Sequence, residues 1–167
     1  MIKKGVKAVS TKVLVSDPKK CTGCKLCELA CSVRHEGECN PALSRIHIID
    51  WNNQGVFLPV FCQQCEDGPC MAACPNEAIY RDYEMDRVMV DYDRCISCKM
   101  CISACPFGAI GFDEDRGKII RCDLCDGDPQ CVLFCDSKAL SLVDTNMLCY
   151  PNMRESARKS AGVKKAA

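Results

Sequence analysis

The pattern of apolar and polar positions predicts several short β-strands. The apolar run at 13–15 predicts a strand, and the runs at 46–49 and 56–60 predict a hairpin around an Asn-Asn-Gln-Gly turn. In segment 79–92, the alternation over Arg87–Asp91 predicts a strand in a second hairpin. No apolar run approaches the roughly 18 residues that a membrane-spanning helix needs, so we expect no membrane span.

Cysteine changes this picture, because 18 of the 167 residues are cysteine. This share exceeds the roughly 10% that marks cysteine-dominated small proteins, in which sulfur chemistry supplements a small buried core. All but Cys39 and Cys149 fall into four groups of four, here called quartets, with C-x2-C at the start and C-x3-C at the end of each. The quartets are Cys21, Cys24, Cys27, Cys31; Cys62, Cys65, Cys70, Cys74; Cys95, Cys98, Cys101, Cys105; and Cys122, Cys125, Cys131, Cys135.

Three chemistries compete for these quartets. A disulfide framework needs an oxidising compartment, but the first residues carry neither a secretory h-region nor paired arginines, which predicts a cytoplasmic protein. Zinc sites usually show two C-x2-C pairs separated by a longer stretch. The run C-x2-C-x2-C-x3-C-P is instead that of bacterial ferredoxins, in which three thiolates bind one 4Fe-4S cluster and the fourth ligates a neighbouring cluster. The sequence therefore predicts four 4Fe-4S clusters, with the fourth cysteine at the head of a following helical segment.

An internal repeat supports this interpretation. Pro75 and Pro106 follow the last cysteines of the second and third quartets, where they disfavour helical backbone angles at the preceding residue. An alanine and an aliphatic residue follow the last cysteine by four and five positions in three quartets, and we expect them to pack on the clusters and enter short strands. These residues are Ala78, Ile79, Ala109, Ile110, Ala139 and Leu140.

The distances between quartets predict how they pair. The second and third quartets lie one hairpin apart and form a complete two-cluster ferredoxin, which leaves the first and fourth to pair around it. The alternative is tandem pairing, first with second and third with fourth, against which the long gap from Cys31 to Cys62 argues. The nested sets are: set one, Cys21, Cys24, Cys27 and Cys135; set two, Cys62, Cys65, Cys70 and Cys105; set three, Cys95, Cys98, Cys101 and Cys74; set four, Cys122, Cys125, Cys131 and Cys31.

Nested pairing predicts an α+β fold of two ferredoxin-like halves with short hairpins and short helices. Residues 1–60 and 111–149 would form the outer half, which holds sets one and four. Residues 61–110 would form the inner half, which holds sets two and three. Residues 150–167 form a basic C-terminal tail, for which disorder or docking to a partner are the alternatives.

Across roughly residues 10–145, the four quartets resemble the four-cluster iron–sulfur subunits that accompany molybdenum or tungsten oxidoreductases. Relatives of this kind serve dimethyl sulfoxide reductase, formate dehydrogenase and carbon monoxide dehydrogenase. The stretch CTGCKLCELACSVRHEGECNPALSRIHI looks most like the small subunit beside tungsten-containing aldehyde oxidoreductases. The resemblance implies a large molybdenum- or tungsten-pterin catalytic subunit as partner, with a flavin-containing subunit or a ferredoxin as the second redox partner.

The function expected is therefore electron transfer within an oxidoreductase complex. A free-standing soluble polyferredoxin and a zinc-binding regulatory module are the alternatives. Four thiolates leave no open position at iron, and no nucleotide or hydrolase signature appears, so we expect no catalysis by this chain alone. The 22 basic residues equal the 22 acidic ones, which argues against a nucleic-acid partner.

Several other residues carry weaker expectations. Cys39 and Cys149 are expected to be buried free thiols, with a substitute ligand as the alternative for Cys39. His35 and His47 are expected on the surface or in loops, with a role as ligand or proton relay as the alternative. Trp51 is expected in a core, with the edge of a cluster or of a partner interface as the alternative. Acidic residues in the cluster loops would lower the neighbouring potentials, or would simply be solvated. These are Glu66, Asp67, Asp123, Asp126 and Asp128.

Overall fold

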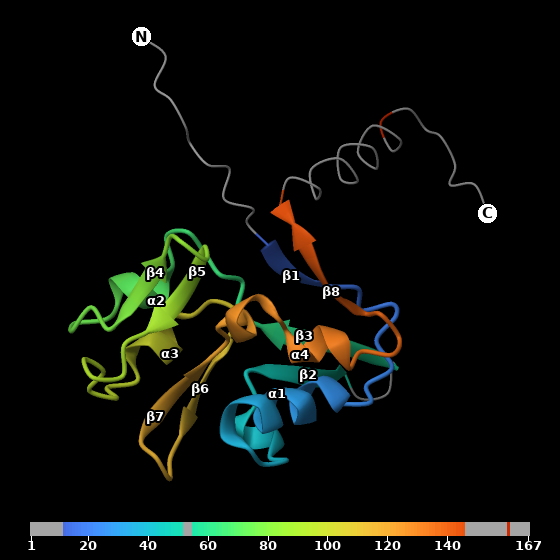
Figure 1. The fold of residues 1–167 in the computed structure, drawn as a ribbon, viewed down its shortest axis with the longest axis horizontal. Helices are drawn as coiled ribbons and strands as arrows, with labels where there is room; N and C mark the ends of the chain where they lie inside the picture. The colour runs from blue at the N-terminus through green and yellow to red at the C-terminus, as the bar shows by residue number, and fades with distance from the viewer. Residues whose placement is uncertain (1–11, 52–54, 146–159, 161–167) are drawn as a thin grey trace.

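The computed structural model describes residues 12–51, 55–145 and 160. Within these residues the chain forms four separate two-stranded antiparallel sheets joined by short helices (Figure 1). The strands are β1 Lys12–Ser16, β2 Ile46–Trp51, β3 Val56–Phe61, β4 Ile79–Asp82, β5 Arg87–Val90, β6 Ile110–Asp113, β7 Lys118–Arg121 and β8 Leu140–Asp144. The helices are α1 Leu26–Glu36, α2 Pro69–Ala72, α3 Met100–Ala104 and α4 Gln130–Leu133, with 3-10 turns η1 Pro41–Leu43 and η2 Leu124–Gly127. The predicted α+β arrangement of short hairpins and short helices is confirmed.

The hairpins predicted from the apolar pattern are present. β2 pairs with β3, with Ile46 opposite Phe61, and β4 pairs with β5, with Ile79 opposite Val90. The predicted strand at 13–15 is β1, and its partner is β8, near the other end of the described chain. This pairing brings the loop of the first quartet close to the segment that follows the fourth, and Asp17 N–H donates to Ala139 C=O at 2.8 Å.

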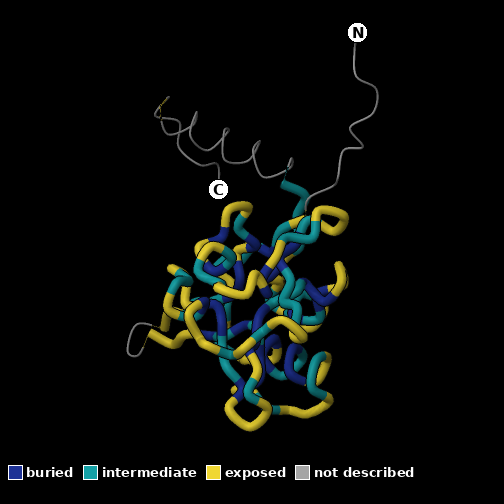
Figure 2. Tube along the Cα trace, turned by 90° about the vertical axis from the view of Figure 1, so that its left-hand side faces the viewer, coloured by how far each residue is buried: buried dark blue, intermediate teal, exposed yellow. Residues whose placement is uncertain are grey.

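Two buried apolar clusters lie inside the molecule, and exposed loops run over its outside (Figure 2). The first combines Leu14, Cys27, Cys31, Ile46, Ile48, Phe61, Leu124, Cys131 and Leu140. The second combines Cys70, Ile79, Val88, Cys101, Ile110 and Ile119. Ile110 on β6 and Ile119 on β7 belong to this second cluster, so the hairpin of β6 and β7 packs with the inner quartets. The predicted boundary between the inner and outer halves, at residues 110–111, would instead assign most of this hairpin to the outer half.

The alanine and aliphatic repeat is confirmed as packing. Ala78 is 0% exposed and Ala139 is 3% exposed, and the aliphatic residues that follow them begin β4 and β8. Small side chains here allow the backbone to approach the cysteines closely, and the N–H of Ala78 donates to the Sγ of Cys74 at 3.2 Å. No helix among the described residues is long and apolar enough to span a membrane.

Candidate iron–sulfur cluster sites

Each quartet includes a helix that begins one residue before its third cysteine. The third cysteine lies in the first turn of the helix, as Cys101 does in α3, and the fourth lies at the helix end, where Cys105 caps α3. Cys74 and Cys135 follow α2 and α4 in the same way, and Cys31 lies one turn after Cys27 within α1. The expectation that the fourth cysteine begins a following helix is therefore wrong. In three quartets the helix precedes the fourth cysteine, and in the first quartet Cys31 lies inside α1.

Two of the predicted ligand sets surround cavities. Cys21, Cys24, Cys27 and Cys135, which are set one, line a single cavity together with Phe134. A second cavity is lined by Cys74, Cys95, Cys98 and Cys101, which are set three, together with Ile79 and Val90. In both cases the structure brings the fourth cysteine of one quartet to the loop of another.

Sets two and four are crowded groups of thiols. Burial raises the pKa of Cys70, and the nearby thiols of Cys62 and Cys105 add to the rise. A Cβ added at Gly68 would lie 3.3 Å from the Sγ of Cys70 and 3.8 Å from the Cβ of Cys65, so this glycine allows the set-two loop to close.

In set four, burial raises the pKa of Cys131 to about 12, with further contributions from Cys31 and Cys125. Burial also raises the pKa of Cys122, and Cys131 is among the thiols that add to it. The tertiary structure therefore brings Cys31 of the first quartet to the cysteines of the fourth quartet.

The chemistry of these groups fits 4Fe-4S clusters. Burial raises the pKa of Cys27 to about 12 and that of Cys101 to about 11, so these thiols stay protonated near neutral pH without a cation beside them. Iron binds thiolates, and binding of metal releases the thiol protons. The buried guanidinium of Arg121 supplies a second observation. Its Nη2 donates to the Sγ of Cys62 at 3.0 Å, and its Nε and Nη1 have no partner among the described residues, so an anionic group at this place fits.

Backbone N–H groups point at several of the thiols. Arg45 N–H donates to the Sγ of Cys31 at 3.2 Å, and Gln64 N–H donates to the Sγ of Cys62 at 3.4 Å. Hydrogen bonds to sulfur raise the potential of an iron–sulfur cluster, because they stabilise the extra negative charge of its reduced state. The loops therefore hold the ligands and also adjust the electrostatics around them.

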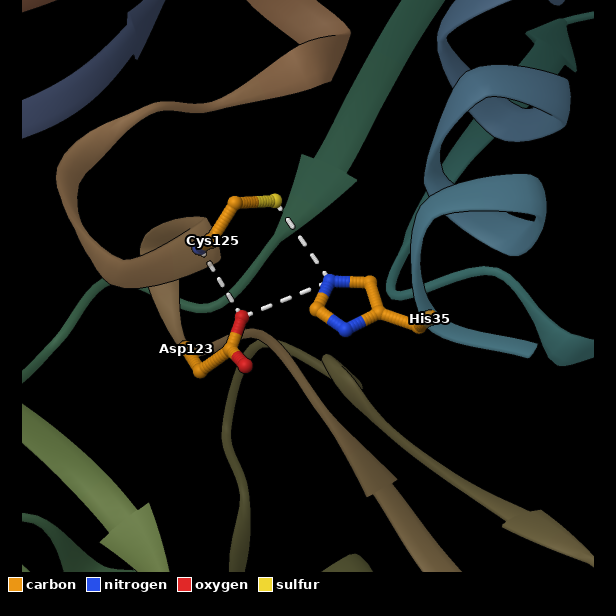
Figure 3. Close-up of side chains that lie close together, drawn as sticks. All are labelled: His35, Asp123 and Cys125. Carbon is orange, nitrogen blue, oxygen red and sulfur yellow. Dashed lines mark hydrogen bonds and ion pairs between the residues drawn. The ribbon is translucent and has the colours of Figure 1, made fainter. Parts of the chain in front are cut away.

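His35 is part of a site, contrary to the expectation of a surface or loop position. It lies on α1 with its side chain 10% exposed, and burial lowers the pKa of its imidazole. Its Nε2 lies 3.4 Å from the Sγ of Cys125 and 3.4 Å from the Oδ1 of Asp123 (Figure 3). The two residues in this contact are 90 positions apart in the sequence, and no local sequence pattern predicts it. His47 lies on β2 and is half-buried, so it is not in a loop either.

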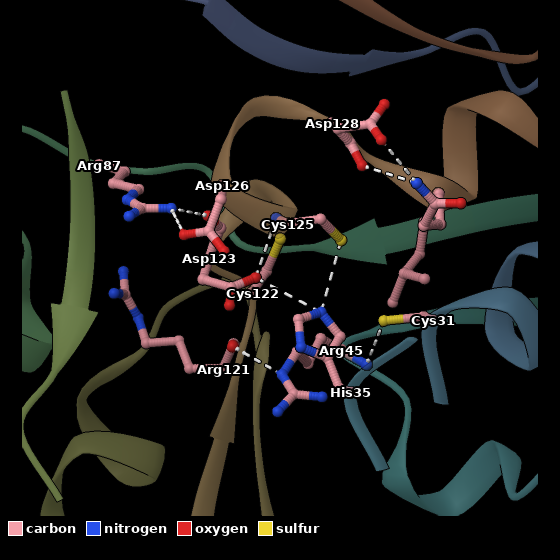
Figure 4. A network of polar contacts seen from close by, with 12 residues as sticks. Cys31, His35, Arg45, Arg87, Arg121, Cys122, Asp123, Cys125, Asp126 and Asp128 are labelled. Atoms are coloured by element: carbon pink, nitrogen blue, oxygen red, sulfur yellow. Dashed lines mark hydrogen bonds and ion pairs between the residues drawn. The ribbon is translucent and has the colours of Figure 1, made fainter. Parts of the chain in front are cut away.

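The acidic loop residues differ in their surroundings (Figure 4). Glu66 and Asp67 are exposed, as the solvated alternative predicts. Asp123 is half-buried and accepts from the N–H of Cys125 at 2.9 Å, whereas Asp126 pairs with Arg87 at 2.5 Å. Asp128 is exposed and accepts from Gln130. Only Asp123 therefore approaches a predicted ligand and has little exposure to solvent.

Two other expectations are wrong. Cys39 is exposed rather than buried, because it lies in the turn that follows α1. Trp51 is 58% exposed at the end of β2 and does not pack in a core. Cys149 and the predicted tail at 150–167 lie outside the described residues, apart from Ser160.

A fold of short hairpins around paired cysteine loops defines a ferredoxin-like protein that holds several 4Fe-4S clusters. The chain belongs to the family described as the 4Fe-4S dicluster domain, which matches residues 53–145, and residues 18–34 match the 4Fe-4S binding domain. The prediction of 4Fe-4S cofactors is confirmed, in place of the disulfide and zinc alternatives. The sixteen quartet cysteines equal the number that four such clusters need.

Relatives with similar sequences are electron-transport proteins. The chain is 40% identical over 132 residues to the aliphatic sulfonate oxidoreductase polyferredoxin-like subunit of Pyrococcus furiosus. This alignment covers 77% of this chain and 76% of the relative. It is 38% identical to the putative electron transport protein YsaA of Escherichia coli, over 85% of this chain and 96% of the relative. The family is therefore one of electron-transfer iron–sulfur subunits.

A solved structure of the BamBC active site complex of benzoyl coenzyme A reductase also aligns. The alignment covers 89% of both chains with 25% identity and a TM-score of 0.49. A likeness at this level does not define what the chain binds.

Proposed function

We propose that this chain is a non-catalytic electron-transfer subunit whose sixteen quartet cysteines hold four 4Fe-4S clusters in the nested sets. Each bound cluster accepts and releases one electron without making or breaking bonds to a substrate. The observation that carries the proposal is the meeting of quartets around common cavities. Cys135 lines the cavity of the first quartet, and Cys74 lines that of the third. Tandem pairing would bring neither cysteine to these places.

Electrostatic interactions between thiols of different sets support a linear order. Beside burial, which is the main cause, Cys70 of set two raises the pKa of Cys101 of set three. In the same way, Cys62 of set two raises the pKa of Cys122 of set four. Cys27 of set one raises the pKa of Cys131 of set four. The sets therefore follow one another in the order three, two, four, one, which suits a relay through the molecule.

The two ends of this series lie nearest to solvent. Cys24 of set one and Cys98 of set three are exposed, whereas Cys70 of set two and Cys125 of set four are buried. Apolar side chains are exposed near both ends, with Ile96 61% exposed beside Cys98 and Phe134 51% exposed in the wall of the set-one cavity. Electrons would enter and leave at these ends, where redox partners can approach.

A pair of double variants tests the nested sets. In Cys65→Ala with Cys105→Ala, both lost ligands belong to set two, so one cluster is lost or converted, at most about four irons per chain. Under tandem pairing, Cys105 serves the fourth quartet, and the same variant damages two clusters. Cys65→Ala with Cys101→Ala is the matched control, because it damages two clusters in either scheme. Iron analysis and electron paramagnetic resonance (EPR) of the full chain count the clusters, and two damaged clusters in the first variant contradict the nested sets.

For the partner, we infer a larger oxidoreductase subunit with a molybdenum- or tungsten-pterin site, and a flavin-containing subunit or a ferredoxin as the second redox partner. The printed name of the Pyrococcus furiosus relative, a subunit of an oxidoreductase, supports the general arrangement. An aldehyde substrate for the larger subunit follows from the initial resemblance alone. The cytoplasmic location also stays a prediction.

A free-standing electron carrier is the second candidate. It is favoured by relatives that are named simply as electron transport proteins, such as HydN of Escherichia coli, which is 37% identical over 89% of its own length. Anaerobic purification of the native protein with metal analysis separates the two. Tungsten or molybdenum on a larger stoichiometric subunit is expected for the first, and about sixteen irons on an isolated small protein would favour the second.

A further inference from the structure

Arg121 is a buried cation with no carboxylate partner among the described residues. It is the last residue of β7, it is 5% exposed, and it directly precedes Cys122 of set four. Its Nη2 donates to the Sγ of Cys62 of set two at 3.0 Å. Its Nε and Nη1 are buried without a hydrogen-bond partner. The guanidinium therefore contacts a cysteine of set two and leaves most of its donors unused.

Two other arginines of the same network show what is unusual about Arg121 (Figure 4). Arg45 pairs with Glu36 at 3.1 Å, and Arg87 pairs with Asp126 at 2.5 Å. Arginine does not lose its proton in proteins, and an uncompensated buried charge is strongly unfavourable. A negative charge other than a carboxylate must therefore balance Arg121.

The nearest candidate for that charge is the group held by Cys62. Four thiolates outweigh the positive charge of a 4Fe-4S core, so the site is anionic and becomes more so when it accepts an electron. The influence of Arg121 already reaches a second thiol of the set. Burial raises the pKa of Cys70, and the positive charge of Arg121 opposes the rise.

We propose that Arg121 is a positioning residue that raises the redox potential of the cluster held by set two, through its charge and its hydrogen bond to Cys62. This inference rests on the proposed ligand sets. The added electron increases the negative charge beside the guanidinium, so the reduced state gains more from Arg121 than the oxidised state does. Set two is interior in the series three, two, four, one, and electrons would therefore collect inside the relay rather than at its exposed end at Cys98.

The test is an EPR-monitored redox titration of the full chain with all clusters present. Cys65→Ser first identifies which one-electron step belongs to set two. In Arg121→Gln, the ratio of reduced to oxidised set-two cluster at a fixed potential is expected to fall about tenfold. This fall corresponds to a midpoint potential lower by about 59 mV for a one-electron step. Arg121→Lys keeps the charge but not the planar fork of donors, so a smaller shift in the same direction is expected.

Arg116→Gln is the matched control. Arg116 lies in the turn of the same hairpin and loses the same charge on substitution, but its side chain is 45% exposed. No shift of the set-two step is expected in this variant, because solvent screens an exposed charge. An equal shift in Arg116→Gln would overturn the proposal.

The remaining outcomes keep the proposal separate from the ligand sets. A set-two step that does not move in Arg121→Gln, with about sixteen irons still bound, overturns the role of Arg121 and leaves the ligand sets intact. If Arg121→Gln does not retain its iron, Arg121→Lys provides the test instead. An unchanged potential of the set-two step in Arg121→Lys then overturns the proposal. If Cys65→Ser leaves all four clusters unchanged, the ligand sets are wrong and the proposal for Arg121 fails with them.

Discussion

His35 is a side chain that lies beside a cysteine proposed as a cluster ligand. Its imidazole is held between Cys125 and Asp123, and α1 fixes its position from the other end of the sequence. With the proton on Nε2, the ring donates towards the sulfur of Cys125 and stabilises negative charge there. Outer contacts of this kind tune metal sites without binding the metal.

We expect His35→Phe to lower the potential of the set-four cluster, because the ring shape stays and the donor is lost. A net hydrogen bond of about 1 kcal/mol corresponds to about 40 mV for a one-electron step. Redox titration followed by EPR measures the shift. His47→Phe is the control, because His47 is half-buried on β2 and forms no hydrogen bond to a thiol among the described residues. Equal potentials in the His35 variant and the unmodified protein would show that the contact does not reach the cluster.

At the scale of elements, the loop of the first quartet packs tightly against a hairpin. Gly23 has a φ of +71°, and a Cβ added there would lie 2.5 Å from the ring of Phe57 on β3. Gly108 follows the third quartet with a φ of +60°, and an added Cβ would meet nothing within 4 Å. Substitution of either glycine would therefore strain the backbone, but only at Gly23 would the new side chain also clash with a neighbour.

We expect Gly23→Ala to reduce occupancy of the set-one cluster, because the ring of Phe57 must shift and the loop that carries Cys21 and Cys24 must move with it. Gly108→Ala should cost only about 1 kcal/mol of backbone strain and keep all four clusters. Iron content after anaerobic purification compares the two. The double variant Gly23→Ala with Phe57→Ala should recover iron, and failure to recover would point to backbone strain rather than to the ring.

At the scale of the whole molecule, no continuous sheet joins the segments that the structure describes. The sheets are four separate pairs of strands, and the two buried apolar clusters themselves contain ligand cysteines. Clusters would join segments that no continuous sheet joins, so binding of iron and sulfide contributes directly to folding. Removal of the clusters would also leave the positive charge of Arg121 buried without compensation.

We expect chelation of iron under oxidising conditions to unfold the protein, with loss of its near-ultraviolet circular dichroism. Anaerobic reconstitution with iron, sulfide and thiol reductant should restore both the signal and the visible absorbance of the clusters. Native-like near-ultraviolet circular dichroism in the iron-free protein would contradict this expectation and show that the apolar clusters suffice.

Much of the fold was predictable because its signals are local. The alternation at Arg87–Asp91 and the apolar runs around 46–60 gave the hairpins, since two strands joined by a short turn find each other without help from the rest of the chain. The partner of β1 was not predictable in this way. It is β8, more than a hundred residues later, and no local pattern links the two strands.

The sequence by itself determined the chemistry. Thiol spacing decides whether one loop can surround a cluster, and that spacing is a property of a few adjacent residues. The tertiary structure decided which distant groups lie side by side at the quartets: Cys135 beside Cys21, His35 beside Cys125, and Arg121 beside Cys62. The physical reason is that these contacts depend on helix direction and on burial. Both are set by the packing of the whole chain, and separations of 59 and 90 positions leave no local pattern to read.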